Sequence, residues 1–266
     1  MGFFADTFIF NEIPSEFYDL YLRTINDSGE ESVMASSDVQ LLTQKLYRKP
    51  VLLFFGAEQT PVLSFPLSMY SPDEITAGVF SEISAWLFGQ MNYCPLRICQ
   101  NDMTDIYFNC FLTSPQIFRA GNIIRGITCT VICDSPWGWR EPITLNYTYD
   151  PDVETHSQSV SIKNESANNF YTLPTNLTIV ANIFGGSISI VNAQDASRLF
   201  HLTLLPNETV NINCDLQTIS SSLVQYPLVG LTDKNFLRLV PGTNDLTISG
   251  NMKSVSITYP VAVKIS

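Results

Sequence analysis

The chain has 266 residues, and its 25 acidic residues outnumber the 14 basic ones, which gives a net charge of −11. A chain this acidic has no basic surface with which to displace counterions from phosphates, so specific nucleic-acid binding is excluded. No apolar run reaches the roughly 18 residues of a membrane-spanning helix, so membrane insertion is not expected. Only 15% of the residues are charged, and such a surface is expected where a chain is buried against partners.

Short runs of alternating apolar and polar residues predict β-strands through most of the first half. The runs are Phe8 to Phe10, Phe17 to Ile25, Val51 to Phe55, Leu96 to Cys99, Ile106 to Leu112 and Ile123 to Cys133. The first half is therefore expected to be mainly β.

One segment predicts a helix, over about 72–88. Ser71 stands at the N-cap position, Pro72 at the first helical position and Glu74 three residues after the cap, an arrangement that satisfies free amides at a helix start. Apolar residues then recur at every fourth position until Gly89 closes the run. They are Ile75, Val79, Ile83 and Leu87.

The stretch 24–50 has a different character. Asn26 to Ser32 is typical of an acidic flexible loop, and Leu41 to Arg48 is too weakly patterned to assign. An ordered excursion that contacts a neighbour and a disordered loop both remain open.

The segment Asp134 to Pro142 contains two prolines, a glycine and two tryptophans. Its turn residues end the preceding strand, and Trp137 and Trp139 indicate packing at a junction between domains. A stacking platform for a sugar is the alternative. We expect an N-terminal domain over 1–135, a junction over 136–142 and a C-terminal domain over 143–266.

Alternation is almost continuous after the junction and predicts an all-β sandwich. The runs are Ile143 to Tyr149, Val160 to Ile162, Leu177 to Ile183, Ile188 to Val191, Leu199 to Leu205, Val210 to Cys214, Phe236 to Val240, Leu246 to Ile248, Val255 to Tyr259 and Val261 to Ile265.

Six cysteines raise the possibility of disulfides or a metal site. They are Cys94, Cys99, Cys110, Cys129, Cys133 and Cys214. Cys129 and Cys133 lie four residues apart on one strand face, roughly 13 Å at about 3.4 Å per residue, which is beyond the reach of a disulfide or a shared zinc ion. Most of the others alternate with apolar residues, so buried free thiols are expected.

The sequence offers no constellation of catalytic residues. His156 and His201 are the two histidines, and His201 shares an outward strand face with Thr203. No nucleophile elbow, P-loop, zinc motif or dinucleotide fingerprint accompanies them. We expect no enzyme, catalytic residue, cofactor or metal ion. A sugar-binding sandwich is the next class to consider, but the chain has no tryptophan after residue 140.

The C-terminal half resembles a known family. Phe236 to Gly250, with the motif Pro241-Gly242-x-Asn244, resembles the closing signature of the distal tail proteins of long-tailed phages. Leu173-Pro174 and Gly186 to Asn192 resemble the same domain. In the motif, Pro-Gly supplies a tight turn, and Asn244 is expected to bond its own backbone two residues on.

The N-terminal half is similar to the same family. Phe8 to Phe17 resembles its opening strand and turn, Ile83 to Gly89 the end of its helix, and Pro115 to Asp134 the strands that close its ring-forming domain. The resemblance covers most of the chain, and 24–50 is the part where it shows no motif.

The resemblance implies a mainly β fold: an N-terminal ring-forming β domain with one α-helix, and a C-terminal galectin-like β-sandwich. It implies a structural hub of a phage tail tip or baseplate, in which a homo-hexameric ring joins the tail tube to the tip. A carbohydrate-binding accessory module is the alternative.

The partners implied are further copies of the chain, the tail tube protein, the tail-associated hub protein, and receptor-binding or tail-fibre proteins. The implied location is the virion. Because Met1 to Asp6 lack the basic region of a signal peptide, we expect assembly in the host cytoplasm. DNA would leave through the lumen, so we expect a negative inner wall that includes Glu30 and Glu31.

Overall fold

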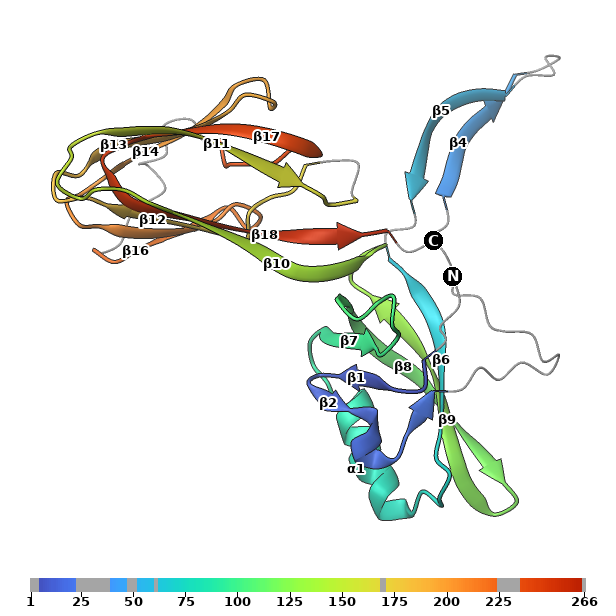
Figure 1. The fold of residues 1–266 in the computed structure, drawn as a ribbon. Helices are drawn as coiled ribbons and strands as arrows, with labels where there is room; N and C mark the ends of the chain where they lie inside the picture. Colours follow the sequence, from blue (N-terminus) through green and yellow to red (C-terminus); the bar gives the residue numbers. More distant parts are fainter. Residues whose placement is uncertain are drawn as a thin grey trace. The chain divides into compact units, whose positions relative to one another are not determined.

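The computed structural model describes residues 5–22, 39–46, 52–59, 62–167, 171–223 and 235–264. The predicted fold class is confirmed, since strands hold 58% of the residues and helices 7%. The chain divides into two compact units, Met1–Trp139 with Lys264–Ser266, and Arg140–Val263 (Figure 1). The predicted loop Asn26 to Ser32, with Glu30 and Glu31, lies outside the described residues. Within the described residues, no helix is long and apolar enough to cross a membrane.

Seven strands of unit 1 form one antiparallel arrangement, in the order β2-β1-β7-β8-β9-β6-β3. They are β1 (Phe8–Phe10), β2 (Ile13–Pro14), β3 (Tyr21–Leu22), β6 (Ser64–Tyr70), β7 (Cys94–Ile98), β8 (Ile106–Ala120) and β9 (Ile123–Cys133). Alternate residues of β8 and β9 are buried, from Ile106 to Leu112 and from Ile127 to Cys133. The alternation that predicted these strands therefore marks the face that is packed against the core.

The α-helix α1 (Ala77–Phe88) starts five residues later than predicted. Its N-cap is Thr76, whose hydroxyl accepts a hydrogen bond from the Val79 amide at 3.4 Å. The expected cap residue, Ser71, accepts instead from the Asp73 amide. Hydrogen bonds to β9 fix the segment before Thr76, since Ser71 N donates to the Arg125 carbonyl and Ile75 N to the Ile124 carbonyl. Tertiary contacts therefore outweigh the local capping pattern.

The helix packs against the sheet through an aromatic side chain. Trp86 is 5% exposed, its ring stacks on Phe8 and Tyr18, and its Nε1 donates to the Phe10 carbonyl at 2.9 Å. Gly89 caps the helix at its C-terminal end, as predicted. This packing joins the helix to the first strand of unit 1.

Two other expectations for unit 1 need correction. The described part of the predicted strand Phe17 to Ile25 is the end of a 3-10 helix, η1 (Ser15–Tyr18), followed by β3, and Asp19 takes a left-handed conformation between them. Residues 23–25 lie outside the described residues. The strand β6 was not predicted, although Phe65, Leu67 and Met69 alternate on its buried face. Pro66 lies in the middle of that strand and weakens the sequence signal.

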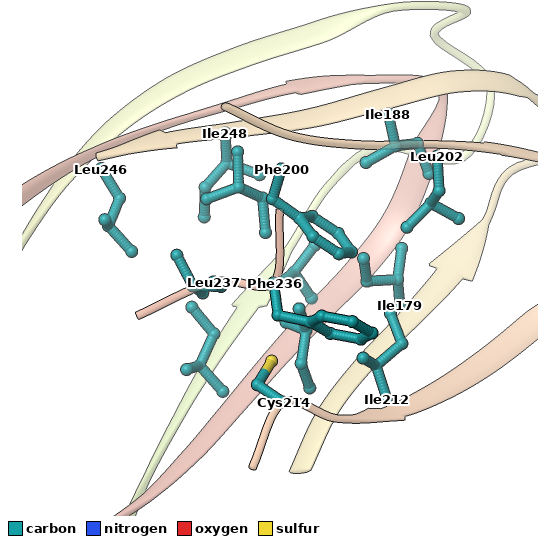
Figure 2. Close-up of a cluster of buried hydrophobic side chains, with 14 of the residues drawn as sticks. Ile179, Ile188, Phe200, Leu202, Ile212, Cys214, Phe236, Leu237, Leu246 and Ile248 are labelled. Carbon is teal, nitrogen blue, oxygen red and sulfur yellow. The ribbon is translucent and has the colours of Figure 1, made fainter. Parts of the chain in front are cut away.

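Unit 2 is a sandwich of two antiparallel sheets, ordered β16-β15-β12-β18-β10 and β11-β17-β13-β14. The strands are β10 (Gly138–Thr148), β11 (His156–Asn164), β12 (Asn176–Ala181), β13 (Gly186–Asn192), β14 (Arg198–Leu204), β15 (Thr209–Asn213), β16 (Thr218–Ser221), β17 (Gly242–Gly250) and β18 (Met252–Val263). Side chains from both sheets meet between them, among them Ile179, Ile212, Ile188 and Phe200 (Figure 2).

Three details of the predicted sandwich differ from the structure. Phe236 to Val240 is not a strand, because it makes a single bridge between Leu239 and Thr172, while Phe236 and Leu237 fill the core (Figure 2). The two strands predicted after residue 252 are one strand, β18. The short polar strand β16 was not predicted, since its residues are Thr, Ile and Ser with little apolar alternation.

The predicted role of Asn244 is also corrected. Its Nδ2 donates to the carbonyls of Gly242 and Val240, and its Oδ1 accepts from the Val240 amide at 2.8 Å. The side chain therefore bonds backbone that precedes it rather than residues ahead of it. Asn244 holds the chain that enters β17.

Candidate assembly surface

A separate hairpin of unit 1, β4 (Val39–Lys45) and β5 (Leu52–Gln59), exposes many apolar side chains. It forms a two-stranded sheet that pairs with no other described strand. The exposed fractions are 61% for Leu41, 38% for Leu42, 58% for Leu52, 40% for Leu53, 66% for Phe54 and 64% for Phe55. Leu41 and Leu42 are consecutive and so point to opposite faces of the hairpin. Both faces therefore carry apolar groups.

A bulge interrupts the hairpin register. Leu42 pairs with Gly56 and Thr43 pairs with Phe54, so Phe55 is the extra residue on β5. Gly56 has a φ of +148°, in the range that favours glycine. A two-stranded ribbon is marginally stable by itself in water, and exposed apolar surface of this kind marks interaction sites. This hairpin is the strongest candidate for a contact with another protein chain.

A second exposed ribbon extends from β8 and β9. Residues 114–120 of β8 are all exposed, with Ile117 at 42% and Phe118 at 50%. Ser114 has a φ of +53°, and the β8 register shifts between Thr113 and Gln116. Before the shift, buried and partly exposed residues alternate along β8, and after it every residue is exposed. The ribbon offers a smaller apolar surface than the β4–β5 hairpin.

The predicted buried thiols are confirmed for five of the six cysteines, all of them free, and Cys99 is exposed instead. Strand register brings three of them into a row, because Cys110 of β8 lies opposite both Cys94 of β7 and Cys133 of β9. Burial raises the pKa of Cys133 to about 12, with a smaller contribution from Asp134, and raises that of Cys110 as well. These thiols therefore stay protonated and unreactive.

The two histidines do not form a joint site. His156 is on β11 and His201 on β14, which are the opposite edges of one four-stranded sheet. His201 Nε2 lies 2.5 Å from Ser187 Oγ, and His156 Nε2 lies 2.7 Å from the Asp150 carbonyl. In the described part of the chain, no three His, Cys, Asp or Glu residues are grouped so that they could hold a metal ion.

The two tryptophans of the junction lie edge to face, with ring centroids 6.5 Å apart and planes at 89°. Trp139 Nε1 donates to Asp134 Oδ1 at 3.4 Å, so a side chain at the end of β9 anchors one ring. Perpendicular rings share no flat surface of the kind on which a sugar stacks. This pair offers no support for the sugar-platform alternative.

Two family models match the chain, and together they cover nearly all of it. One, described as a phage tail protein N-terminal domain, matches residues 3–135, and the other, described as a phage tail C-terminal domain, matches residues 137–259. No curated protein matches the chain in sequence.

Solved structures were also compared with the fold. The Dit (gp 19.1) protein of phage SPP1 aligns with a TM-score of 0.69 at 10% sequence identity, covering 96% of this chain and 98% of that one. A chain of the phage p2 baseplate in its activated conformation with Sr aligns with a TM-score of 0.49 at 7% identity, covering 93% and 99%. The chain therefore belongs to the phage tail protein family, and its fold is the one the resemblance to distal tail proteins implied.

Proposed function

We propose that this chain is the hub of a phage tail tip or baseplate. Six copies form a ring through residues 1–135 and join the tail tube to the tip proteins, and residues 143–266 form a sandwich that faces outward. The similarity in fold to the SPP1 protein carries this proposal, because it extends over nearly the whole of both chains. That protein is described as a paradigm of the hub adsorption apparatus in phages that infect Gram-positive hosts.

The β4–β5 hairpin supplies a surface suited to ring assembly. Burying a large apolar side chain contributes about 1.5–3 kcal/mol relative to leaving it exposed. Leu41, Phe54 and Phe55 are each more than 60% exposed in the single chain. A contact that covers them in a neighbouring copy stabilises both the interface and the hairpin.

The proposed role is structural rather than catalytic. His156 and His201 lie on opposite edge strands, and the buried thiols are protonated. The partners are the tail tube protein, the tail-associated tip protein, and receptor-binding or tail-fibre proteins, in a virion assembled in the host cytoplasm. Each copy contributes a charge of −11, and a negative lumen wall lets DNA pass without holding it.

Changing the hairpin tests the proposal. Phe54→Ser with Phe55→Ser in the full chain should weaken the hexamer at least tenfold in sedimentation equilibrium, because these two rings are exposed in the single chain and their loss leaves the core intact. Leu216→Ser is the matched control, since Leu216 is 69% exposed on a turn of unit 2. If both variants assemble as the parent chain does, the hairpin is not the ring contact.

A further inference from the structure

One end of unit 2 exposes apolar side chains on three separate loops. Val153 lies in the loop between β10 and β11, Ile183 and Phe184 lie in the turn between β12 and β13, and Leu205 lies in the turn between β14 and β15. Their exposed fractions are 43%, 52%, 46% and 51%. We refer to these four residues as the loop-tip patch. Aliphatic and aromatic residues on turns are unusual, since turns favour Gly, Pro, Asn, Asp and Ser.

Asn182 forms hydrogen bonds to all three loops, although it is not one of the four exposed residues of the loop-tip patch. Its side chain is 1% exposed. Nδ2 donates to the carbonyls of Val153 at 2.9 Å and Glu154 at 3.0 Å, and Oδ1 accepts from the amides of Phe184 and Gly185. The Asn182 carbonyl accepts from the Asn207 amide at 2.9 Å. One buried residue, through its side-chain amide and its main-chain carbonyl, therefore bonds to all three loops.

Two further contacts stiffen the same end. Gly185 has a φ of +62°, and a Cβ there would lie 2.6 Å from Pro206 N, so the two turns are packed backbone to backbone. Glu208 is fully buried, and its carboxylate accepts from the Leu205 amide at 2.7 Å and from the Ser221 hydroxyl. A surface held in this way is organised before it binds, which lowers the entropy cost of association.

The position of the patch suits a contact with another protein. The chain enters unit 2 at Arg140 and leaves it at Val263. The strands β10 and β18, which are neighbours, run the length of the sandwich between that end and the loop-tip patch (Figure 1). The patch is thus at the end of the sandwich away from the chain connections.

Charge around the patch identifies the kind of partner. Asp150, Asp152 and Glu154 flank Val153 in the same loop, and all three are exposed. None of them makes an ion pair with any residue in the described ranges. A second copy docked through the same patch would bring these three carboxylates against their own counterparts, so like charges disfavour it here. An apolar segment that carries lysine or arginine beside its apolar side chains complements the surface.

We propose that the loop-tip patch is the docking site for such a basic apolar segment of another tail protein. The proposal rests on the proposed function as a tail hub and names the chemistry of one peripheral partner. The apolar side chains of the partner cover Val153, Ile183, Phe184 and Leu205, and its cations pair with the three carboxylates.

The test uses phage particles in which this chain is supplied from a plasmid in place of the phage's own copy. Ile183→Asp with Phe184→Asp should reduce one peripheral virion protein at least tenfold per particle, measured by quantitative mass spectrometry. The matched control is Leu216→Asp, an exposed leucine on the turn after β15, at the other end of the sandwich. Control particles should keep their full protein content.

Carbodiimide cross-linking of parental particles tests the charge of the partner. It joins a carboxylate to a lysine amine without a spacer, and it should link Asp152 or Glu154 to a lysine of the same peripheral protein. Particles of Ile183→Asp with Phe184→Asp that keep every protein, or cross-links from this loop that lead only to other copies of the chain, would overturn the proposal.

The outcomes separate this inference from the proposed function. If the parental chain is absent from the tail tip, the hub assignment fails whatever the variants do. If the parental chain is present at the tip and the loop variant loses nothing, only the docking site fails.

Discussion

Asn192 donates a hydrogen bond from Nδ2 to Oδ1 of Asn244 over 2.8 Å, and neither side chain is exposed to solvent. The same Nδ2 donates to the Arg238 carbonyl at 2.9 Å, and Asn192 Oδ1 accepts from the Gln194 amide. The two amides join the ends of β13 and β17 to the irregular segment that begins at Phe236. The asparagine of the closing motif thus acts as a buried clamp.

Removing the side-chain amide of Asn244 should lower the free energy of unfolding. Asn244→Ala leaves the Val240 amide without its side-chain acceptor, while the Val240 carbonyl keeps the hydrogen bond from Asn164 Nδ2. A buried polar group left unpaired costs about 1–3 kcal/mol. We expect urea denaturation to show a loss of about 2 kcal/mol in the free energy of unfolding. Thr243→Ala, at the exposed neighbour on β17, should stay within about 0.5 kcal/mol. Equal losses for the two variants would contradict the clamp.

Because α1 begins at Ala77, proline should be tolerated at that position but not further inside the helix. Ala77 is the first helical residue, where proline is tolerated, and Thr76 has φ −67° and ψ 162°, which a following proline favours. Ala77→Pro should change the free energy of unfolding by less than about 1 kcal/mol, whereas Ser81→Pro, exposed inside the same helix, should cost about 3 kcal/mol or more. A helix that began at residue 72 would make both substitutions similarly damaging in thermal unfolding.

The buried thiols predict a loss of stability in alkali. Burial raises the pKa of Cys129 to about 12, while a thiol in the unfolded chain titrates near 8.5. Between these values the unfolded state binds fewer protons than the folded one, so stability falls as pH rises, by up to about 1.4 kcal/mol per pH unit for each such thiol. The contribution is complete below about pH 8.5.

Urea denaturation from pH 8 to pH 10.5 measures this slope. Cys129→Ala removes one titrating thiol and should make the fall with pH shallower than in the parent chain, even though the substitution lowers stability at every pH. An unchanged slope would mean that the Cys129 thiolate is not excluded from the folded state.

The strands of the two cores could be predicted because each has one buried face. Phe108 and Cys110, or Val210 and Ile212, repeat with the period of a strand, and their burial follows from that period. In the β4–β5 hairpin, only part of β5 was predicted, over Val51 to Phe55, and β4 was not assigned. Leu41 and Leu42 are both exposed in the single chain, so no alternation separates an inner from an outer face.

Contacts between segments that are far apart in the sequence could not be predicted either. Cys94, Cys110 and Cys133 lie in a row because of the register between three strands. Spacing along the sequence gives only the separation of two cysteines on the same strand, Cys129 and Cys133. No sequence pattern predicted the role of Asn182, because that role depends on three loops that are far apart in the sequence and meet only in the folded chain. The start of α1 was misplaced since β9 holds the preceding residues.

The oligomeric state of the purified full-length chain tests the hub assignment most directly. Negative-stain electron microscopy with mass photometry should show six-fold rings with six times the 29.8 kDa mass of one chain. A chain that remains monomeric at high concentration, with no rings in the images, would contradict the account.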